Sequence, residues 1–118
     1  MSDDPHLIVS QEGEVTRINF RDRSILEETT IQSIGEDISL MIEEAVSPKL
    51  LISFTGVEHL SSAALGTLIT INNKIRQKGG QLRLSDIHEQ IYEVFVITRL
   101  DKLFQIHETA DTATESFT

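Results

Sequence analysis

The stretch from Leu50 to Gly80 constrains the fold of this chain more than any other part of its sequence. It opens with a short apolar run, residues 50–54, of the kind found in strands that are buried on both faces. After a turn and two serines, residues 63–78 carry apolar side chains at the spacing of a helix, and two glycines then favour the left-handed residue that ends many helices. A buried strand that leads into a helix predicts an α/β fold.

The first half of the chain predicts a hairpin and a helix. Residues 6–10 and 15–20 are rich in β-forming side chains, and the segment between them, 11–14, contains the glycine of a turn. From Glu27 onward, apolar side chains recur at three- and four-residue spacing, which predicts a helix. Pro48 should end that helix, because the residue before a proline avoids helical backbone angles.

The second half continues the alternation. Residues 81–85 and 103–106 are predicted strands, residues 91–98 carry the apolar spacing of a helix, and residues 109–118 are expected to form a terminal helix or a frayed tail. The predicted order is β-β-α-β-α-β-α-β-α. Because alternating strands and helices imply right-handed crossovers, we expect one α/β domain over residues 1–118. It should contain a mostly parallel sheet of about four to five strands, with the hairpin at its edge and helices packed against it.

The composition is that of an ordinary globular protein and excludes several classes of function. The 118 residues carry a formal net charge of −9, which disfavours nucleic acid and anionic membranes as partners, because both bind proteins largely through phosphate neutralisation. The absence of cysteine excludes disulfides and thiolate sites. No apolar run approaches the roughly 18 residues of a membrane helix, and the acidic residues 1–5, expected to be disordered, do not resemble a signal peptide. We therefore expect a cytoplasmic protein.

Three segments resemble the STAS domain, a family named for sulphate transporters and anti-sigma-factor antagonists. Residues 51–66 read LISFTGVEHLSSAALG and resemble the family's buried strand, hydrophobic pair and Asp-Ser-Ser/Thr-Gly-Leu-Gly helix start. Residues 78–84 read KGGQLRL and resemble its Gly-Gly turn and following strand. Residues 98–106 read TRLDKLFQI and resemble its Thr-Gly-Leu-Asp-Lys-Leu-Phe-x-Ile tail. The resemblance implies the STAS fold and points to the single-domain bacterial anti-sigma-factor antagonists.

Alignment on the shared Leu-Gly pair places Ser62 at the serine that partner kinases phosphorylate in this family, with Ser61 as the second choice. The chain also departs from the family pattern. Ser61 stands where an aspartate is usual, and Ala63 and Ala64 replace the second hydroxyl residue and the glycine. Near the first helix, residues 23–26 lack the acidic residue that the family often carries there.

Ser62 has two possible roles, and the sequence leaves both open. As a helix N-cap, its hydroxyl would accept a backbone N–H, an interaction worth about 1 kcal/mol, and Ser61 could fill that role equally well. As a phosphoacceptor, it would gain a charge of about −1.5 to −2 at a helix end whose free N–H groups and dipole favour anions. The fold would tolerate the phosphate. A partner packed against the small, neutral side chains at this helix start would be displaced by it.

The resemblance also implies a protein partner, an anti-sigma factor that is a serine kinase of the switch type. The unphosphorylated chain would bind this kinase and free the sigma factor, and phosphorylation of Ser62 would reverse the binding. The binding surface is expected to combine the turn before the second predicted helix with the exposed start of that helix. Its predicted residues are Glu58, His59, Ser61, Ser62, Ala63 and Thr67.

Catalysis, metals and cofactors are not expected. Glu58 and His59 precede the serines, but a serine nucleophile needs a base that a third group orients, and the sequence offers no convincing one. His6, His88 and His107 lie far apart without the spacing of metal ligands. No glycine-rich phosphate-binding motif occurs. We therefore expect a binding protein that is not an enzyme, with no catalytic residues, no metal and no cofactor.

Two functions fit these expectations. The first is the phosphorylation-controlled antagonist described above. The second is a constitutive, unphosphorylated STAS scaffold in a signalling assembly or a transporter complex, which the replacement of the usual aspartate by Ser61 favours. The first predicts that Ser62→Asp abolishes partner binding, and the second predicts unchanged affinity.

Overall fold

The computed structural model describes residues 6–117. Residues 1–5, predicted to be disordered, and residue 118 lie outside the described residues. The elements follow one another as β1 (Leu7–Glu12), β2 (Val15–Phe20), β3 (Ser24–Ile25), α1 (Glu28–Glu44), β4 (Lys49–Ser53), β5 (His59–Leu60), α2 (Ser62–Gln77), β6 (Gln81–Ser85), α3 (Glu89–Ile97), the 3-10 turn η1 (Leu100–Lys102), β7 (Gln105–His107) and α4 (Ala110–Glu115). The predicted alternation of strands and helices is confirmed.

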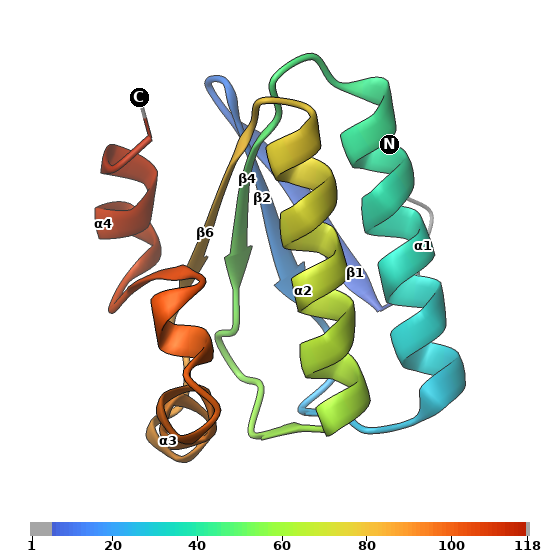
Figure 1. Cartoon of the computed structure of the whole chain (residues 1–118), viewed down its shortest axis with the longest axis vertical. Coiled ribbons are helices and arrows are strands. Elements are labelled where there is room, and N and C mark those ends of the chain that lie inside the picture. Colours follow the sequence, from blue (N-terminus) through green and yellow to red (C-terminus); the bar gives the residue numbers. More distant parts are fainter. Residues whose placement is uncertain (1–5, 118) are drawn as a thin grey trace.

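A five-stranded sheet in the order β1-β2-β4-β6-β7 organises the domain. β1 runs antiparallel to β2, and the other neighbours are parallel, so the predicted mostly parallel sheet with a hairpin edge is confirmed. The register places Ile18, Ile52 and Leu84 side by side across β2, β4 and β6. Figure 1 shows α1 and α2 together on one face of the sheet and α4 on the other, with α3 beyond the ends of the central strands.

The main hydrophobic core lies between the sheet and the helices α1 and α2. Ile18, Ile52 and Leu84 are completely buried on the sheet. Burial of each such side chain stabilises the fold by about 1.5–3 kcal/mol. Residues three and four apart share one face of a helix, which is why α1 directs one stripe into this core. The stripe consists of Ile31, Ile34, Ile38 and Ile42.

The opposite face of the sheet is covered by the short helix α4. Ala110 and Ala113 of this helix pack with Val15 and Leu51 of the sheet in a second, smaller cluster. Small side chains allow the helix to lie close to the strands. Both faces of β4 are therefore buried, as its apolar run predicts.

Arg83 of β6 ties the end of α4 to the sheet. Its Nε donates to Oγ of Ser116 at 2.8 Å, and its guanidinium carbon lies 4.9 Å from the centre of the Phe117 ring. Its Nη1 and Nη2 donate to the Leu82 carbonyl and to Oε1 of Gln81, each at 3.0 Å. Arg83 is only 7 % exposed, and this burial lowers the pKa of its guanidinium. Among the described residues, neutral oxygens and an aromatic ring surround the charge.

Several predicted boundaries in the first half are corrected. The first strand continues to Glu12 rather than ending at residue 10, because the chain reverses in a tight turn at Gly13, which has a φ of 62°. α1 ends at Glu44, four residues before Pro48, which was predicted to end it. The helix of the central stretch begins at Ser62, one residue earlier than predicted, and ends at Gln77.

The second half also differs in detail. α3 begins at Glu89 and ends at Ile97, earlier than the predicted range. The last strand begins at Gln105 rather than at residue 103, because residues 100–102 coil into η1. The terminal segment forms a helix rather than a frayed tail, and Thr109 caps it by accepting the Thr112 backbone N–H at 3.1 Å.

Candidate functional site

The loops that precede α1 and α2 meet at one end of the molecule. Ser24 and Ile25 of β3 pair in parallel with His59 and Leu60 of β5. The Ser61 backbone N–H donates to the Ile25 carbonyl at 3.2 Å. The sequence predicts a turn before the second helix, and the structure adds the two short strands β3 and β5 to this region. Two-residue strands carry no periodicity, and they form only because the fold brings the two loops together.

Ser61 is the N-cap of α2, and Ser62 is the first residue of the helix. The Ser61 hydroxyl accepts the Ala64 backbone N–H at 3.2 Å, and its backbone is extended, with φ −83° and ψ 165°. Its carbonyl accepts the Leu65 N–H at 3.2 Å, which starts the helical hydrogen bonding. Ser62 is exposed, and its hydroxyl forms no hydrogen bond with the described residues. Of the two serines, Ser61 therefore caps the helix, and the exposed Ser62 hydroxyl is not used in the cap.

The first turn of α2 differs from the first turns of α1, α3 and α4 in its charge. Each of the other three carries an acidic residue in its first turn, namely Glu28, Glu89 or Asp111. α2 carries none. An acidic group at a helix N-terminus offsets the positive end of the dipole and stabilises the helix by about 0.3–1 kcal/mol. At α2 no acidic side chain in the first turn provides this stabilisation.

The predicted partner surface lies mostly on this end of the molecule. Glu58, His59, Ser62 and Ala63 are exposed, and Ser61 is half-buried. Thr67 lies apart from them, because it lines the groove between α1 and α2 and its Oγ1 donates to the carbonyl of Ala63 at 3.2 Å. The structure therefore brings most of the predicted residues together and places Thr67 at their flank.

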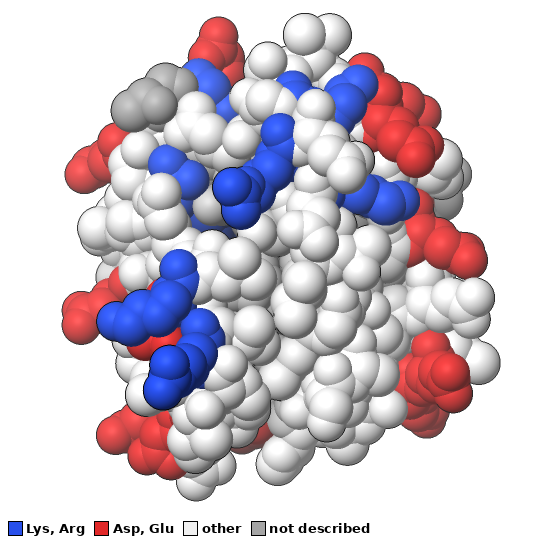
Figure 2. Space-filling model, in the orientation of Figure 1, with Lys and Arg blue, Asp and Glu red and all other residues white. Residues whose placement is uncertain are grey.

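The charges on this side of the molecule are unevenly distributed. Lys74 and Arg76 lie in the last turn of α2, far from the serines. In Figure 2, one group of Lys and Arg lies in the upper part of the view, where α2 ends, and another lies at the lower left, whereas the lower centre, where α2 begins, is mostly uncharged. The first turn of α2 is itself uncharged, while Glu58 lies exposed in the loop before it.

A hollow of about 260 Å³ adjoins Glu58 and His59, and the sequence prediction missed it. Leu26, Leu60 and Leu65 form part of its lining, and α3 supplies a second side. The residues of α3 that line it are Gln90, Ile91 and Val94. The sequence does hold one indication of this hollow: α3 has more apolar side chains than a single buried face needs, so some of them must be exposed.

The exposed apolar side chains of α3 extend this surface away from the serines. Val94 and Val96 are 42 % and 46 % exposed, and Ile97 is 80 % exposed. Val94 and Ile97, three residues apart, share one face of the helix, whereas Val96 lies on another. Exposed apolar patches mark sites of interaction with other proteins. The loop before α2 and α3 together therefore offer a partly apolar surface, on which Glu58, Glu89 and Glu93 are exposed acidic residues.

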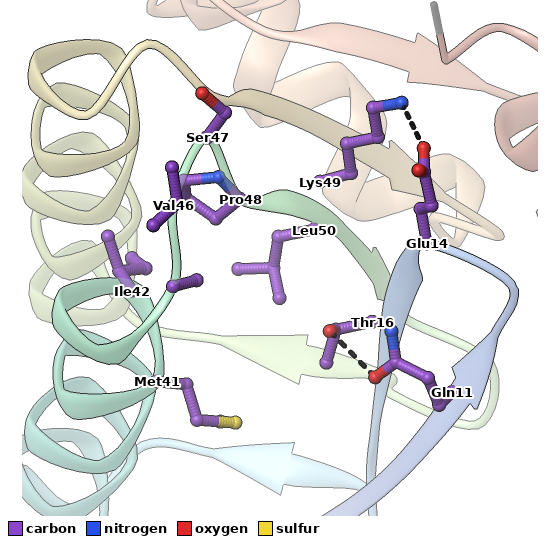
Figure 3. Close-up of a pocket in the computed structure, with 11 residues that line it drawn as sticks. Gln11, Glu14, Thr16, Met41, Ile42, Val46, Ser47, Pro48, Lys49 and Leu50 are labelled. Atoms are coloured by element: carbon purple, nitrogen blue, oxygen red, sulfur yellow. Dashed lines mark hydrogen bonds and ion pairs between the residues drawn. The ribbon is translucent and has the colours of Figure 1, made fainter.

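A different hollow, of about 480 Å³, lies between the last turn of α1 and the β1–β2 hairpin. Figure 3 shows its polar rim, where Lys49 forms an ion pair with Glu14 at 2.8 Å and Thr16 donates a hydrogen bond to Gln11 at 3.0 Å. It opens at the beginning of β4, whereas ligands of open α/β sheets bind beyond the carboxyl ends of the strands. The four polar side chains of this rim are already paired with one another, so the hollow does not compete with the serine pair as a functional site.

Other chemistry has little support in the described chain. No group of three or more His, Asp or Glu side chains in residues 6–117 is arranged to hold a metal ion. His59 is exposed, and its backbone N–H donates to the Arg23 carbonyl at 3.1 Å. Within the same range, none of the helices combines the length and apolar character needed to cross a membrane.

The sheet order and the layers of helices define a small α/β module. Its distinguishing feature is the loop and serine pair that follow the central strand β4. The family model of the STAS domain matches residues 7–113. The chain belongs to the STAS domain family, as the resemblance of its motifs predicts.

One relative from Thermotoga neapolitana is named as an anti-sigma factor antagonist homologue. It is 31% identical over 67 residues, which are 57% of this chain and 59% of that protein. The match thus spans little more than half of the relative's length.

Solved structures with this fold include an anti-sigma-factor antagonist STAS domain protein from Planctomyces limnophilus. It has a TM-score of 0.84 and 23% identity, over 95% of this chain and 97% of that one. The cell fate determinant SpoIIAA from Bacillus, solved in its phosphorylated form, has a TM-score of 0.70 and 17% identity, over 92% of this chain and 96% of that one. At these identities the two structures establish the shared fold.

Proposed function

We propose that this protein is a regulatory antagonist of the anti-sigma-factor antagonist type. It binds a serine kinase of the switch type that serves as an anti-sigma factor, and phosphorylation of Ser62 ends the binding. The observation that carries the proposal is the different position of the two neighbouring serines. Ser61 caps α2, while Ser62 is exposed at a helix start that holds no acidic residue.

The chemistry of the switch follows from this position. The Ser62 Oγ attacks the γ-phosphorus of ATP bound by the kinase, the bond to ADP breaks, and the serine proton leaves to a base of the kinase. The product carries about −1.5 to −2 charges. The dipole and free N–H groups of α2 favour that charge, so the domain itself remains folded.

The partner experiences the opposite effect. It packs against a surface made of small and neutral side chains, chiefly Ser62 and Ala63, with Gly66 one turn along the helix. A phosphate placed within this contact is bulky and loses its hydration without a matching cation. Such a buried, unpaired charge costs several kcal/mol, and the complex therefore dissociates.

On this proposal the chain is a binding protein that catalyses nothing itself, and it acts in the cytoplasm, where the kinase and the sigma factor work. The relative from Thermotoga neapolitana and the shared fold with SpoIIAA support this role. A second function is a constitutive scaffold that is never phosphorylated. The observation that favours it is Ser61, which stands in place of the aspartate that usually precedes the phosphorylated serine of the family.

A binding experiment separates the two functions. The anti-sigma serine kinases of the source organism are expressed one at a time, and their affinity for the chain is measured by calorimetry. Ser62→Asp should weaken binding at least about 100-fold, equivalent to about 2.7 kcal/mol. Asn73→Asp serves as the matched control, because it adds the same charge to an exposed site on the same helix, away from the serines. Equal affinity for Ser62→Asp and the unsubstituted chain would favour the scaffold.

A further inference from the structure

Two buried serines and one aspartate form a cluster at the carboxyl ends of β4 and β6. Ser53 and Ser85 are register partners on these neighbouring strands, and both are completely buried. Their hydroxyls donate to the same atom, Oδ2 of Asp86, over 2.9 Å and 2.7 Å. Hydrogen bonds to an ionised carboxylate are shorter and stronger than those between neutral groups.

The direction of these hydrogen bonds extends the cluster to Thr55. The Ser53 hydroxyl has one proton, which it gives to Asp86. Its 2.9 Å contact with Oγ1 of Thr55 therefore requires Thr55 to donate. The hydroxyls of Thr55, Ser53 and Ser85 are thus all oriented, directly or in sequence, toward one carboxylate.

This cluster joins two loops that are distant in sequence. Thr55 belongs to the loop that follows β4 and leads through Val57, which is 2 % exposed, to the serine pair before α2. Asp86 belongs to the loop that follows β6 and leads to α3, whose N-cap is His88. The chain also turns sharply at Asp86, which has a φ of 58° and is one of the residue types that tolerate this left-handed conformation.

The two joined loops border the same hollow. Glu58 and His59 line it from the loop after β4, and Gln90 and Ile91 line it from the first turn of α3. One wall of the 260 Å³ hollow thus follows the loop after β4, and the other follows the loop after β6. The distance between these two walls therefore depends on the hydrogen bonds to Asp86 that join the two loops.

We propose that Asp86 is a positioning residue for partner binding. It holds the loop before α2 and the first turn of α3 at a fixed separation, so that the kinase meets the serine pair and α3 as one preformed surface. This inference rests on the proposed function, because it names the residue that shapes the surface used there. Asp86 would thus influence partner affinity from outside the serine motif, without touching the partner itself.

Hydrogen exchange of the backbone amides, measured on the full chain without any partner, tests the positioning directly. Asp86→Ala should raise exchange about tenfold in residues 54–61 and 87–91, while amides of β2 and α1 stay unchanged. Asp86→Asn keeps an acceptor oxygen and tolerates the left-handed backbone, so its rise should be smaller. Ser47→Ala is the matched control, because it shortens a side chain at another left-handed residue, with a φ of 51°, outside the cluster.

Kinetics with the kinase supply the second measurement. For Asp86→Ala, the KM for phosphorylation of Ser62 should rise about tenfold with kcat unchanged, because the surface is loosened while the reacting hydroxyl is intact. Ser53→Ala provides a variant that leaves Asp86 in place, and it should raise exchange in residues 54–61 alone.

Unchanged exchange in both segments of Asp86→Ala, or a uniform rise that includes β2 and α1, would overturn the positioning role. If Asp86→Ala does not fold, unchanged exchange in Ser53→Ala overturns it equally. A kinase that fails to phosphorylate the unsubstituted chain, combined with the expected exchange pattern, contradicts the proposed function and leaves the positioning of the loops by Asp86 supported.

Discussion

Ser61 accepts the backbone N–H of Ala64 through its hydroxyl at 3.2 Å, and this hydrogen bond fixes the start of α2. The cap satisfies one of the donors that every helix leaves free at its N-terminus. Because Ser61 fills this role, the neighbouring Ser62 hydroxyl is not needed for folding. A residue that is exposed, unconstrained and next to a firmly capped helix end can be modified without loss of the fold.

The two serines should therefore respond differently to substitution. Ser61→Ala should lower the free energy of unfolding by about 1 kcal/mol, because the cap is lost. Ser62→Ala should change it by less than about 0.5 kcal/mol, as is usual for exposed sites. Urea denaturation measures both values. Ser61→Asp is the matched control and should retain the stability, since aspartate caps helices as well as serine does. A larger loss for Ser62→Ala than for Ser61→Ala would contradict the assignment of the cap.

Two helical glycines provide a second contrast. A Cβ added at Gly66 meets no heavy atom within 4 Å, so Gly66→Ala should stabilise the domain by up to about 1 kcal/mol through helix propensity. A Cβ added at Gly35 would lie 2.8 Å from Cγ2 of Thr67, so Gly35→Ala should push α1 and α2 apart and destabilise the domain by about 1–3 kcal/mol. Thermal unfolding followed by circular dichroism distinguishes them. Shifts of the same sign would refute the close approach of the helices.

Arg83 should control the attachment of α4. Arg83→Lys removes the forked contacts with Ser116 and the stacking on Phe117, so the free energy of unfolding should fall by about 1–2 kcal/mol. The amides of α4 should exchange faster than those of α1. Arg76→Lys is the control, because it makes the same change at an exposed position and should have almost no effect. Full protection of α4 in Arg83→Lys would show that the alanine contacts alone hold the helix.

Lys49 and Glu14 should couple stability weakly to pH. The hydrogen bond and the charge of Lys49 lower the pKa of the Glu14 carboxyl. A carboxyl whose pKa is lower in the folded state stabilises that state above its unfolded pKa of about 4.3, and this contribution is lost as the pH falls through the folded pKa. Lys49→Met should raise the Glu14 pKa to its ordinary value in an NMR titration. An unchanged pKa in that variant would mean that the ion pair does not persist in solution.

The fold was predictable from the sequence because its main elements bury periodic apolar side chains. The isoleucines of α1 and the apolar run of β4 identify a helix and a buried strand without further information. Arg83 illustrates what periodicity cannot predict. Nothing local indicates that a six-residue helix, α4, covers the second face of the sheet and buries this arginine.

The candidate site was predictable only in part. The motif located the serine pair, but two adjacent serines are equivalent until backbone angles decide that Ser61 is extended and Ser62 helical. The cluster at Asp86 depends on the register of β4 and β6, which brings together residues more than thirty positions apart. The α3 wall of the hollow was missed because the surplus of apolar side chains in α3 indicates an exposed apolar face but not which loop lies beside it.

Phosphopeptide mapping by mass spectrometry tests the central claim most directly. The protein is isolated from its native cells, with and without stress, and digested with trypsin. Cleavage after Lys49 and Lys74 yields the peptide 50–74, which contains both serines, and fragmentation between them locates the phosphate. We expect phosphate on Ser62 whose occupancy changes with the condition. A fully covered peptide in which Ser61 and Ser62 are unmodified under every condition would contradict the switch and support a constitutive scaffold.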